Sequence, residues 1–325
     1  MHFRARARAR ARARSRVRFE HEHHFIEHEH DKLKRMVAFS KKCRFLKQLG
    51  QLLYSVGLLR LGTKRFQFDE TYLMKHTILI TGAGSGLGRS LGIYLAQQGH
   101  SLLITDVDQA RAEAVAEEIV AVGGMATPHR LDVTSESDAQ RLFGDYGPVG
   151  VLINNAGLQH VAPLDEFPVA KWDLLFDVMV KGTFLMTRSA LPGMRTAGFG
   201  RIVHIGSIHS LVASPYKAAY TAAKHSLLGF SKVLALETAG TDITSNVICP
   251  AYIRTPLVDA QIGDQARARG ISEQRVIEDV MLAPMPKKAF ISAEEVAAAI
   301  DYLISPLARN VTGQTITIDG GWTAQ

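Results

Sequence analysis

Hydrophobic and polar positions change their spacing repeatedly along the chain from about residue 76 onward. Short apolar runs stand apart, and between them apolar residues recur at helical spacing, first from Leu87 to Gln98. The runs expected to be strands are 76–81, 101–105, 149–154, 200–206, 243–249 and 314–319, with a further strand that ends at Asp132. Strands that alternate with helices in this way indicate a parallel sheet whose two faces are both covered by helices.

This pattern predicts one α/β domain over residues 74–325, a doubly wound parallel sheet of the Rossmann type. Within it, residues 257–290 are polar and charged, with two prolines near their end. We expect this segment to be a small helical lid that closes on a substrate and excludes water. A plain surface hairpin of helices would have the same composition, so the role of a lid needs a test of its own.

Residues 1–73 have a different composition from the rest of the chain. They contain RARARARARARSRVR at 4–18 and EHEHHFIEHEHD at 20–31. Such low-complexity segments cannot bury a core, so we expect a disordered leader. It could be a targeting peptide, a basic arm for nucleic acid or anionic lipid, or a segment outside the working protein. Met74 stands just before the first predicted strand and would be a natural start, which favours the third interpretation.

The charge is distributed unevenly, and this changes the meaning of the net charge of +7. Residues 1–74 carry 18 Lys and Arg against 7 Asp and Glu, a net of +11, whereas residues 75–325 carry 20 against 24, a net of −4. A mildly acidic domain argues against nucleic-acid binding by that domain. The sequence has no apolar run long enough to span a membrane, and its two cysteines form no disulfide framework. We therefore expect no membrane association and a reducing, cytoplasmic location.

A glycine-rich turn, TGAGSGLG at 81–88, follows the first predicted strand and opens the first helix. Gly82, Gly86 and Gly88 allow a tight turn and a close approach of the backbone to a pyrophosphate, and the helix N-terminus behind them offers free N–H groups. The spacing differs from the general Gly-x-Gly-x-x-Gly dinucleotide fingerprint. Any tight turn from strand to helix favours glycine, but the position after the first strand makes cofactor binding the better interpretation.

Two aspartates stand at the ends of the next two predicted strands. Asp106 can accept hydrogen bonds from the ribose hydroxyls of adenosine and would repel a 2′-phosphate, which favours NAD over NADP. Asp132 is a candidate for the adenine edge. Asp106 could instead be an ordinary solvated strand end, and Asp132 a helix cap or turn residue, a role that Thr134 and Ser135 could serve equally well.

The stretch PYKAAYTAAKHS at 215–226 places Tyr220 and Lys224 one helical turn apart, so both side chains leave the same face. The pKa of a free tyrosine is about 10, and lowering it to about 7 requires roughly 4 kcal/mol. An ammonium at about 4 Å supplies energy of that order at an effective dielectric constant of about 20. Although such pairs also occur by chance in exposed helices, this pair is predicted to be a general base that takes a proton from an alcohol while hydride moves to a cofactor.

Two further motifs lie at the ends of predicted strands, where ligands bind in this fold. They are NNAG at 154–157 and IGSIHS at 205–210, which contains Ser207. With TGAGSGLG and YTAAK, in this order, they resemble the short-chain dehydrogenase/reductase family over residues 76–325. The resemblance implies that Ser207, Tyr220 and Lys224 are the catalytic residues, that the chain forms a homotetramer, and that no metal takes part. It also implies an NAD site formed by Gly82, Ser85, Gly86, Leu87, Gly88, Asp106, Asp132, Val133, Asn154, Ala156, Gly157, Tyr220, Lys224, Pro250, Ile253 and Thr255.

Longer stretches narrow the resemblance. NNAGLQHVAPLDEFPVAKW, HSLVASPYKAAYTAAKHS, RTPLVDAQI and DGGWTAQ are similar to bacterial family members that interconvert D-3-hydroxybutyrate and acetoacetate with NAD. The resemblance implies a hydroxy acid held by Gln159, Ser207, His209, Lys217, Tyr220, Tyr252 and Gln261. One lysine and several neutral donors would favour an acid over an uncharged alcohol. The alternatives are another 3-hydroxy acid, a 3-oxoacyl thioester, or a binder of the cofactor without catalytic activity.

Several positions depart from the pattern of the family, and two of them bear directly on the site. Met179 stands where the family usually has an Asn as a fourth catalytic residue, and a thioether cannot replace an amide donor. If that role rests on the backbone carbonyl, Met179 keeps it, and if it rests on the amide, turnover falls. Tyr252 replaces the Trp of the hydroxybutyrate-oxidising members, which keeps an aromatic wall but changes its width.

Overall fold

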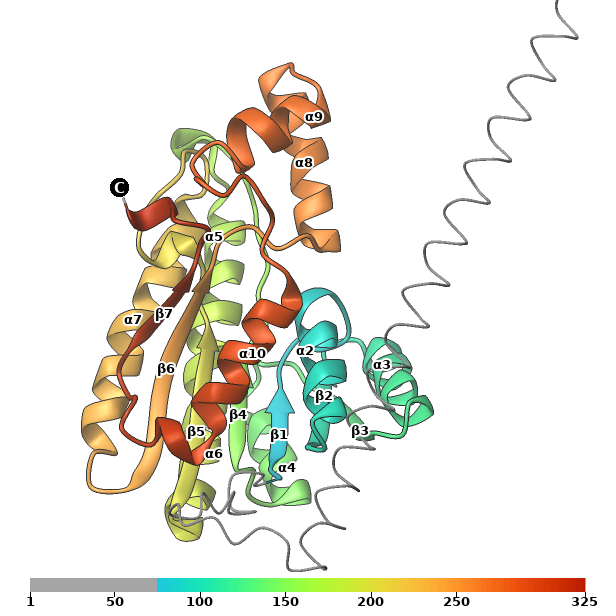
Figure 1. Cartoon of the computed structure of the whole chain (residues 1–325), viewed down its shortest axis with the longest axis vertical. Coiled ribbons are helices and arrows are strands. Elements are labelled where there is room, and N and C mark those ends of the chain that lie inside the picture. Colours follow the sequence, from blue (N-terminus) through green and yellow to red (C-terminus); the bar gives the residue numbers. More distant parts are fainter. Residues whose placement is uncertain (1–74, 325) are drawn as a thin grey trace, which may run out of the picture. The chain divides into compact units, whose positions relative to one another are not determined.

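The computed structural model describes residues 75–324 as a parallel sheet between two layers of helices (Figure 1). The expected leader, residues 1–73, lies outside the described residues. The strands are β1 Thr77–Ile80, β2 Ser101–Asp106, β3 Met125–Arg130, β4 Val151–Asn154, β5 Phe199–Ile205, β6 Asp242–Pro250 and β7 Thr315–Ile318. The predicted doubly wound α/β fold is confirmed.

The strand order is β3-β2-β1-β4-β5-β6-β7, and every neighbouring pair is parallel. Ile78 of β1 lies opposite Leu102 of β2 on one side and Val151 of β4 on the other. Strands buried on both faces need apolar side chains at successive positions, which explains the runs TILI and VLIN. The order reverses between β1 and β4, and ligands bind at such a switch point, beyond the carboxyl ends of the strands.

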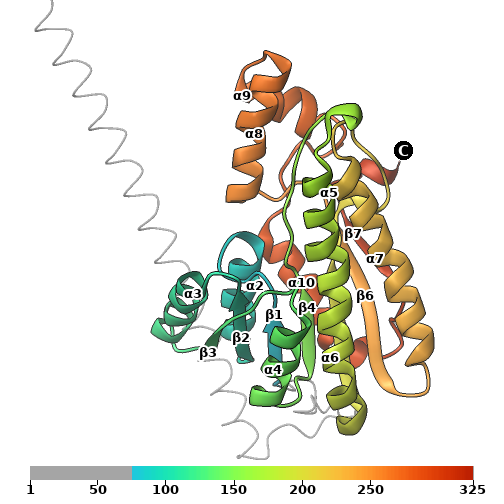
Figure 2. The same cartoon turned by 180° about the vertical axis from the view of Figure 1, so that it is seen from behind.

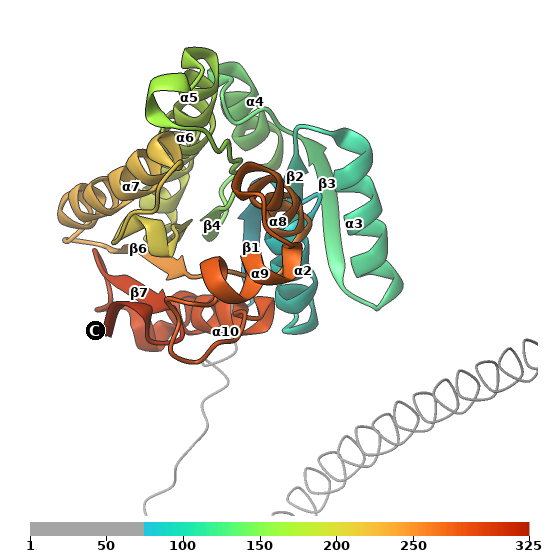
Figure 3. The same ribbon diagram turned by 90° about the horizontal axis from the view of Figure 1, so that it is seen from above.

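Helices cover both faces of the sheet (Figures 2 and 3). The first face is covered by α2 Gly86–Gln97, α3 Gln109–Ala121 and α10 Ala293–Ile304, and the second by α4 Glu136–Tyr146, α6 Gly182–Ala197 and α7 Ala218–Glu237. Alternation along the strands supplies both cores, because Ile78 and Ile80 pack on the first face and Leu79 on the second. The sheet is thereby held rigid beneath the loops at its carboxyl edge.

The remaining helical segments belong to the connections between these strands and helices. Before α6, α5 Val169–Phe176 continues into a π-helical turn, Asp177–Lys181. After β6 come α8 Pro256–Arg269, α9 Glu273–Arg275 and a second π-helical turn, Val276–Met281. Short 3₁₀ turns occupy Leu164–Glu166, Ile208–Ser210, Pro306–Ala308 and Trp322–Ala324.

Helices α8 and α9 lie over the carboxyl ends of the central strands, as the view from above shows (Figure 3). The segment expected to be a lid is therefore helical and stands over the edge where a ligand would bind. The residue that follows it, Ile291, is tied to the loop after β6 by a hydrogen bond from its backbone N–H to the carbonyl of Tyr252, at 2.9 Å. That this segment closes on a substrate stays a prediction.

Candidate active site

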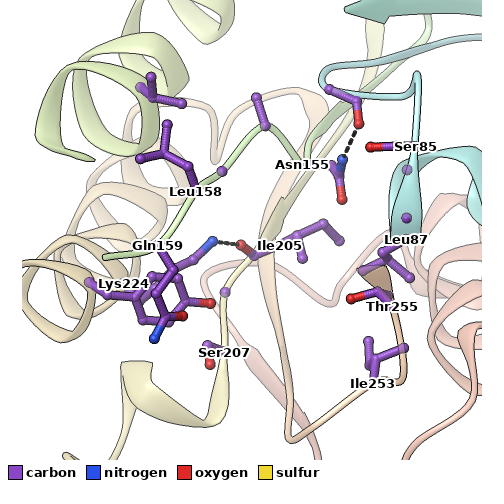
Figure 4. A pocket seen from close by; sticks show the side chains of 18 of the residues that line it. Ser85, Leu87, Asn155, Leu158, Gln159, Ile205, Ser207, Lys224, Ile253 and Thr255 are labelled. Carbon is purple, nitrogen blue, oxygen red and sulfur yellow. Dashed lines mark hydrogen bonds between the residues drawn. The ribbon is translucent and has the colours of Figure 1, made fainter. Parts of the chain in front are cut away.

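A cavity of about 700 Å³ lies at the carboxyl edge of the sheet. This volume is within the range of roughly 300–1,000 Å³ that is usual for ligand sites. All but one of the site residues expected from the sequence line it, and the exception is Asn154. Figure 4 shows Gln159, Ser207 and Lys224 on one side of the cavity, with Ser85, Leu87 and Thr255 on the other.

The glycine-rich turn needs glycine for two different reasons. Gly82 and Gly86 have φ angles of +61° and +54°, a conformation that favours glycine. A Cβ atom on Gly88 would lie 2.5 Å from the Asn155 Nδ2 and from the carbonyl oxygen of Gly82. The Ser85 side chain, at the N-cap of α2, makes no capping hydrogen bond. The first amide groups of α2 are thus open to an anion such as a pyrophosphate.

The two asparagines of NNAG have separate roles, and the structure corrects the assignment made from the sequence. The Asn154 Nδ2 is turned away from the cavity and lies 3.2 Å from the Thr187 Oγ1 and 3.1 Å from the His204 Nδ1. Asn155 lines the cavity instead, and its Nδ2 donates to the carbonyls of Thr81 and Gly82 at 2.8 and 3.0 Å. Side chains alternate along a strand, so the residue just past the strand end turns to the site.

Asp106 stands at the end of β2 and lines the cavity, as expected. Its carboxylate accepts from the backbone N–H groups of Gly84 and Asp108 at 3.0 and 3.1 Å, which fixes it beside the glycine-rich turn. Arg111 of α3 also lines this end of the cavity. Nothing in the sequence distinguished Arg111 from an ordinary exposed residue of a helix.

Asp132 lies two residues beyond β3 rather than at its end. Its Oδ1 accepts from the backbone N–H of Thr134 at 2.9 Å and from the Thr134 hydroxyl at 2.7 Å, and Ser135 caps α4. Asp132 is therefore a turn residue, one of the roles that the sequence left open. It nevertheless lines the cavity, with Val133 and Thr134 beside it.

These features fit a dinucleotide cofactor. The turn at Gly82–Gly88 and the uncapped start of α2 suit a pyrophosphate, and Asp106 suits the hydroxyls of a ribose. Thr255, on the same side of the cavity as Leu87, caps α8 and accepts from the backbone N–H of Val258 at 3.4 Å. A Cβ atom on Gly86 would lie 3.8 Å from the Thr255 Cβ, so Thr255 lies directly beside the glycine-rich turn.

The three expected catalytic residues meet at the end of β5. The Ser207 Oγ accepts from the backbone N–H of His209 at 3.1 Å and is also hydrogen-bonded to Tyr220. The Lys224 Nζ donates to the carbonyl of Ile205 at 2.6 Å, which Figure 4 marks, and lies 5.6 Å from the centroid of the Tyr220 ring. Ser207, Tyr220 and Lys224 thus form one hydroxyl, phenol and ammonium group facing the cavity.

Burial dominates the protonation of this group, which corrects the electrostatic expectation from the sequence. Burial raises the pKa of Tyr220, and the hydrogen bond with Ser207 offsets this only in part. Burial also lowers the pKa of Lys224 to about 8. The ammonium of Lys224 was expected to lower the pKa of Tyr220, but it is hydrogen-bonded to Ile205 and stands off from the phenol ring. Tyr220 is therefore protonated at neutral pH in this state.

A second cluster surrounds Lys217, which is only 4% exposed. Its Nζ donates to the Tyr252 hydroxyl at 3.2 Å and lies 3.3 Å from the His209 Nε2. Burial, followed by the charge of Arg269, lowers the pKa of Lys217 to about 8. Burial and the Lys217 charge lower the pKa of His209 to about 3, so this imidazole is neutral at pH 7.

Lys217 has no acidic partner in the described part of the chain, since no ion pair there includes it. Two buried amide atoms beside the cavity, the Gln159 Nε2 and the Gln261 Oε1, likewise find no hydrogen-bond partner among residues 75–324. Buried polar groups are normally paired, and leaving one unpaired is costly. A buried cation beside unpaired amides is the arrangement expected of a site for an anion.

Met179 lies in the π-helical turn after α5, is 1% exposed and does not line the cavity. It packs in a small apolar cluster with Leu175, Ala219 and Ala223, and its carbonyl accepts from the Thr183 hydroxyl at 2.8 Å. The thioether thus fills the core beside the helix that carries Tyr220 and Lys224. No polar contact of this side chain takes the place of an amide donor.

Comparisons with known proteins agree with this geometry. The family model described as short chain dehydrogenase matches residues 76–266, and the chain belongs to this family of oxidoreductases. The chain is 42% identical over 260 residues, 78% of this chain and 100% of the relative, to D-beta-hydroxybutyrate dehydrogenase of Rhizobium meliloti (strain 1021). A protein of the same name from Cupriavidus necator is 39% identical, covering 77% of this chain and 98% of the relative. A 3-oxoacyl-(acyl-carrier-protein) reductase of Thermotoga maritima is 32% identical, with 75% and 96% covered.

Proposed function

We propose that this short-chain dehydrogenase oxidises D-3-hydroxybutyrate to acetoacetate, reversibly, with NAD as the hydride acceptor. The observation that carries the proposal is the buried ammonium of Lys217, which stands in the cavity without an acidic partner among residues 75–324. A substrate carboxylate would supply that partner, and charge-assisted hydrogen bonds of this kind are the stronger ones. The names of the two relatives at 42% and 39% identity support the same choice of substrate.

The two clusters divide the substrate between them. Lys217, with Gln159 and Gln261, would hold the carboxylate, while Ser207 and Tyr220 would hold the hydroxyl that is oxidised. Tyr252 closes one wall, where its ring stacks on Trp322 with centroids 6.1 Å apart. Two anchors on one short molecule fix its orientation, and this lowers the entropic part of the barrier.

When bound, NAD would accept the hydride, and the positive charge of its ring would favour the phenolate form of a nearby tyrosine. In oxidation, Tyr220 accepts the proton of the alcohol, and in reduction it donates that proton. The Ser207 hydroxyl, which also lines the cavity, would donate a hydrogen bond to the same substrate oxygen. Because burial raises the pKa of Tyr220, its protonated form is ready for reduction at neutral pH, and oxidation should speed up as the pH rises.

The choice of NAD over NADP rests on Asp106. Both of its carboxylate oxygens accept a backbone N–H group and stay at the end of β2, where a 2′-phosphate would meet a negative charge. Arg111, on the same wall, is held by the Asp108 carboxylate, with its Nε 3.3 Å from the Asp108 Oδ2. We therefore expect discrimination against NADP.

A 3-oxoacyl thioester is the competing substrate, because a relative at 32% identity bears the name of a reductase for that class. A thioester carries no charge at the carbon where the acid carries its carboxylate. Binding it would leave Lys217 buried and unpaired, which is unfavourable. The buried lysine therefore favours the free acid.

The test is NADH formation by the full-length protein with D-3-hydroxybutyrate, with L-3-hydroxybutyrate, NADP and a 3-oxoacyl thioester (NADPH consumption) as comparisons. We expect NAD-linked oxidation of the D acid, abolished in Tyr220→Phe. Tyr302→Phe is the matched control, since Tyr302 is 47% exposed on α10. Preference for the thioester would overturn the choice of substrate, and a folded protein that binds NAD without turnover would support a non-catalytic binder.

A further inference from the structure

Three polar residues of α8 stand four positions apart, at Gln261, Gln265 and Arg269. Residues at this spacing share one side of a helix. Gln261 and Gln265 are 6% and 5% exposed, and Gln261 lines the cavity. The stripe therefore leads from the substrate end of the cavity to Arg269 at the last turn of α8.

Arg269 reaches the loop before α7. Its guanidinium carbon lies 5.8 Å from the centroid of the Tyr216 ring, a cation–π arrangement. Arg269 forms no ion pair with any residue in the described range 75–324. Tyr216 precedes Lys217 directly, so this contact joins α8 to the residue next to the buried ammonium.

Tyr216 has an unusual backbone and a second long-range contact. Its φ angle is +70°, a left-handed conformation that residues other than glycine adopt rarely. Such conformations persist only where the surroundings hold them, and they gather at functional sites. The carbonyl of Tyr216 accepts from the backbone N–H of Ala162 at 3.1 Å, which ties it to the segment that follows β4 and carries Gln159.

Three segments therefore meet at Tyr216, and each one carries a residue of the carboxylate site. The segment after β4 carries Gln159, the loop before α7 carries Lys217, and α8 carries Gln261. We propose that Arg269 and Tyr216 form a clasp that positions these three residues around the carboxylate of the substrate. This inference rests on the proposed function. Both residues act through others, so they are positioning residues and not catalytic ones.

The experiment measures kcat and KM for D-3-hydroxybutyrate in the full-length protein and in Arg269→Gln, Tyr216→Asn and the double variant. Asn tolerates a left-handed backbone, so Tyr216→Asn removes the ring and keeps the turn. We expect each single change to raise KM about two- to five-fold, the effect of one exposed cation–π contact, with kcat and the KM for NAD unchanged. The KM of the double variant should be no higher than the higher KM of the two single variants, because both substitutions remove the same contact.

Matched variants distinguish the effect of losing the contact between Arg269 and Tyr216 from the effects of losing a positive charge or destabilising the fold. Arg267→Gln removes the same charge two residues away, where Arg267 is exposed and bonded to Asp264 on its own helix, and should leave KM unchanged. Tyr216→Phe keeps the ring and should behave like the wild type. Binding of acetoacetate can be followed independently by the fluorescence of Trp322, which stacks on Tyr252.

The pH dependence of KM gives a readout that a purely structural role would not move. The titratable or charged groups that act on Lys217 are His209, Tyr252 and Arg269, while Tyr220 and His225 act on His209 or Tyr252. The charge of Arg269 lowers the pKa of Lys217, so Arg269→Gln should shift the rise of KM at alkaline pH to higher pH. His209 and Tyr252, with pKa values of about 3 and about 12, stay neutral there.

The outcomes distinguish the two proposals. An active wild type whose KM is unchanged in both single variants would overturn the clasp and leave the proposed function standing. Additive losses in the double variant would also overturn it, because the two residues would then act separately. A wild-type protein that oxidises no short hydroxy acid would overturn the proposed function. In that case the binding of acetoacetate still tests the clasp, because an affinity that is equal in the wild type and the variants would overturn it.

Discussion

At the scale of single residues, charge and burial decide what the cavity can bind. Lys217 and Lys224 are both buried lysines with pKa values lowered to about 8, yet their surroundings differ. Lys224 donates to a backbone carbonyl beside the phenol, whereas Lys217 faces a phenol and a neutral imidazole. The first arrangement suits proton transfer, and the second leaves a positive charge for the substrate to neutralise.

Replacing Lys217 by methionine should therefore impair binding rather than chemistry. A hydrogen bond to a charged group contributes about 1.5–3 kcal/mol, so KM for the hydroxy acid should rise roughly 10- to 100-fold. The value of kcat should change little, because Ser207, Tyr220 and Lys224 remain in place. Steady-state kinetics checks this, with Lys232→Met as the control, since Lys232 is an exposed lysine of α7, the helix that follows Lys217. A large fall in kcat with unchanged KM would show that Lys217 does not hold the carboxylate.

Restoring the asparagine usual for the family at Met179 should not improve the enzyme. Met179 is buried among apolar side chains, and an amide there would lack partners. We expect Met179→Asn to lower the free energy of unfolding by about 1–3 kcal/mol and to leave kcat no higher than in the wild type. Denaturant unfolding and kcat measured side by side test this. An increase in kcat would mean that the amide itself contributes to proton transfer.

At the scale of elements, the junction of β1 and α2 depends on the absence of side chains. A Cβ atom on Gly88 would lie 2.5 Å from the Asn155 Nδ2, so Gly88→Ala must displace Asn155 or the turn. We expect a loss of about 1–3 kcal/mol in the free energy of unfolding and a higher KM for NAD. Gly229→Ala, on α7 with open space around its Cβ position, should instead stabilise by about 0.5–1 kcal/mol. Thermal unfolding compares the stability of the two variants with that of the wild type, and equal changes in both variants would refute the steric argument.

Element types were predictable from the sequence because apolar spacing reports burial directly. The fully buried strands and the amphipathic helices lie within a few residues of their expected positions, including the strand that carries Asn154 at its end. The sequence could not predict that the Asn154 side chain points away from the cavity, because its partner, His204, is 50 residues away on β5. The protonation of Tyr220 was missed for a similar reason, since burial depends on the whole fold while the spacing to Lys224 is local.

At the scale of the whole molecule, several predictions stay open. None of the helices within residues 75–324 is long and apolar enough to cross a membrane. The homotetramer and the cytoplasmic location remain predictions, as does the absence of nucleic-acid binding by the mildly acidic domain. Sedimentation of the full-length protein would measure its assembly, and the mass of one chain is 35.6 kDa. A monomer would contradict the expectation drawn from the family.

Acid stability is a property of the whole fold, because buried histidines must stay neutral in it. Burial lowers the pKa of His76 to about 4 and the pKa of His204 to about 3. In the unfolded chain the histidine pKa is about 6.5, so between pH 6.5 and about 4 the unfolded state binds more protons than the folded one. The free energy of unfolding should therefore fall as the pH drops through this window and be nearly level from about pH 6.5 to about 8, where the buried Lys217 and Lys224 begin to lose their protons.

The His76 side chain allows this prediction to be tested at one position. Its ring stacks between those of His100 and Phe199, with centroids 5.7 and 4.8 Å away, so phenylalanine can replace it without losing the stack. His76→Phe removes one group that resists protonation and should be about as stable as the wild type at pH 7 but more stable relative to it at pH 5. Denaturant unfolding at both pH values measures the difference. Parallel curves for the two proteins would show that His76 titrates alike in the folded and unfolded chains.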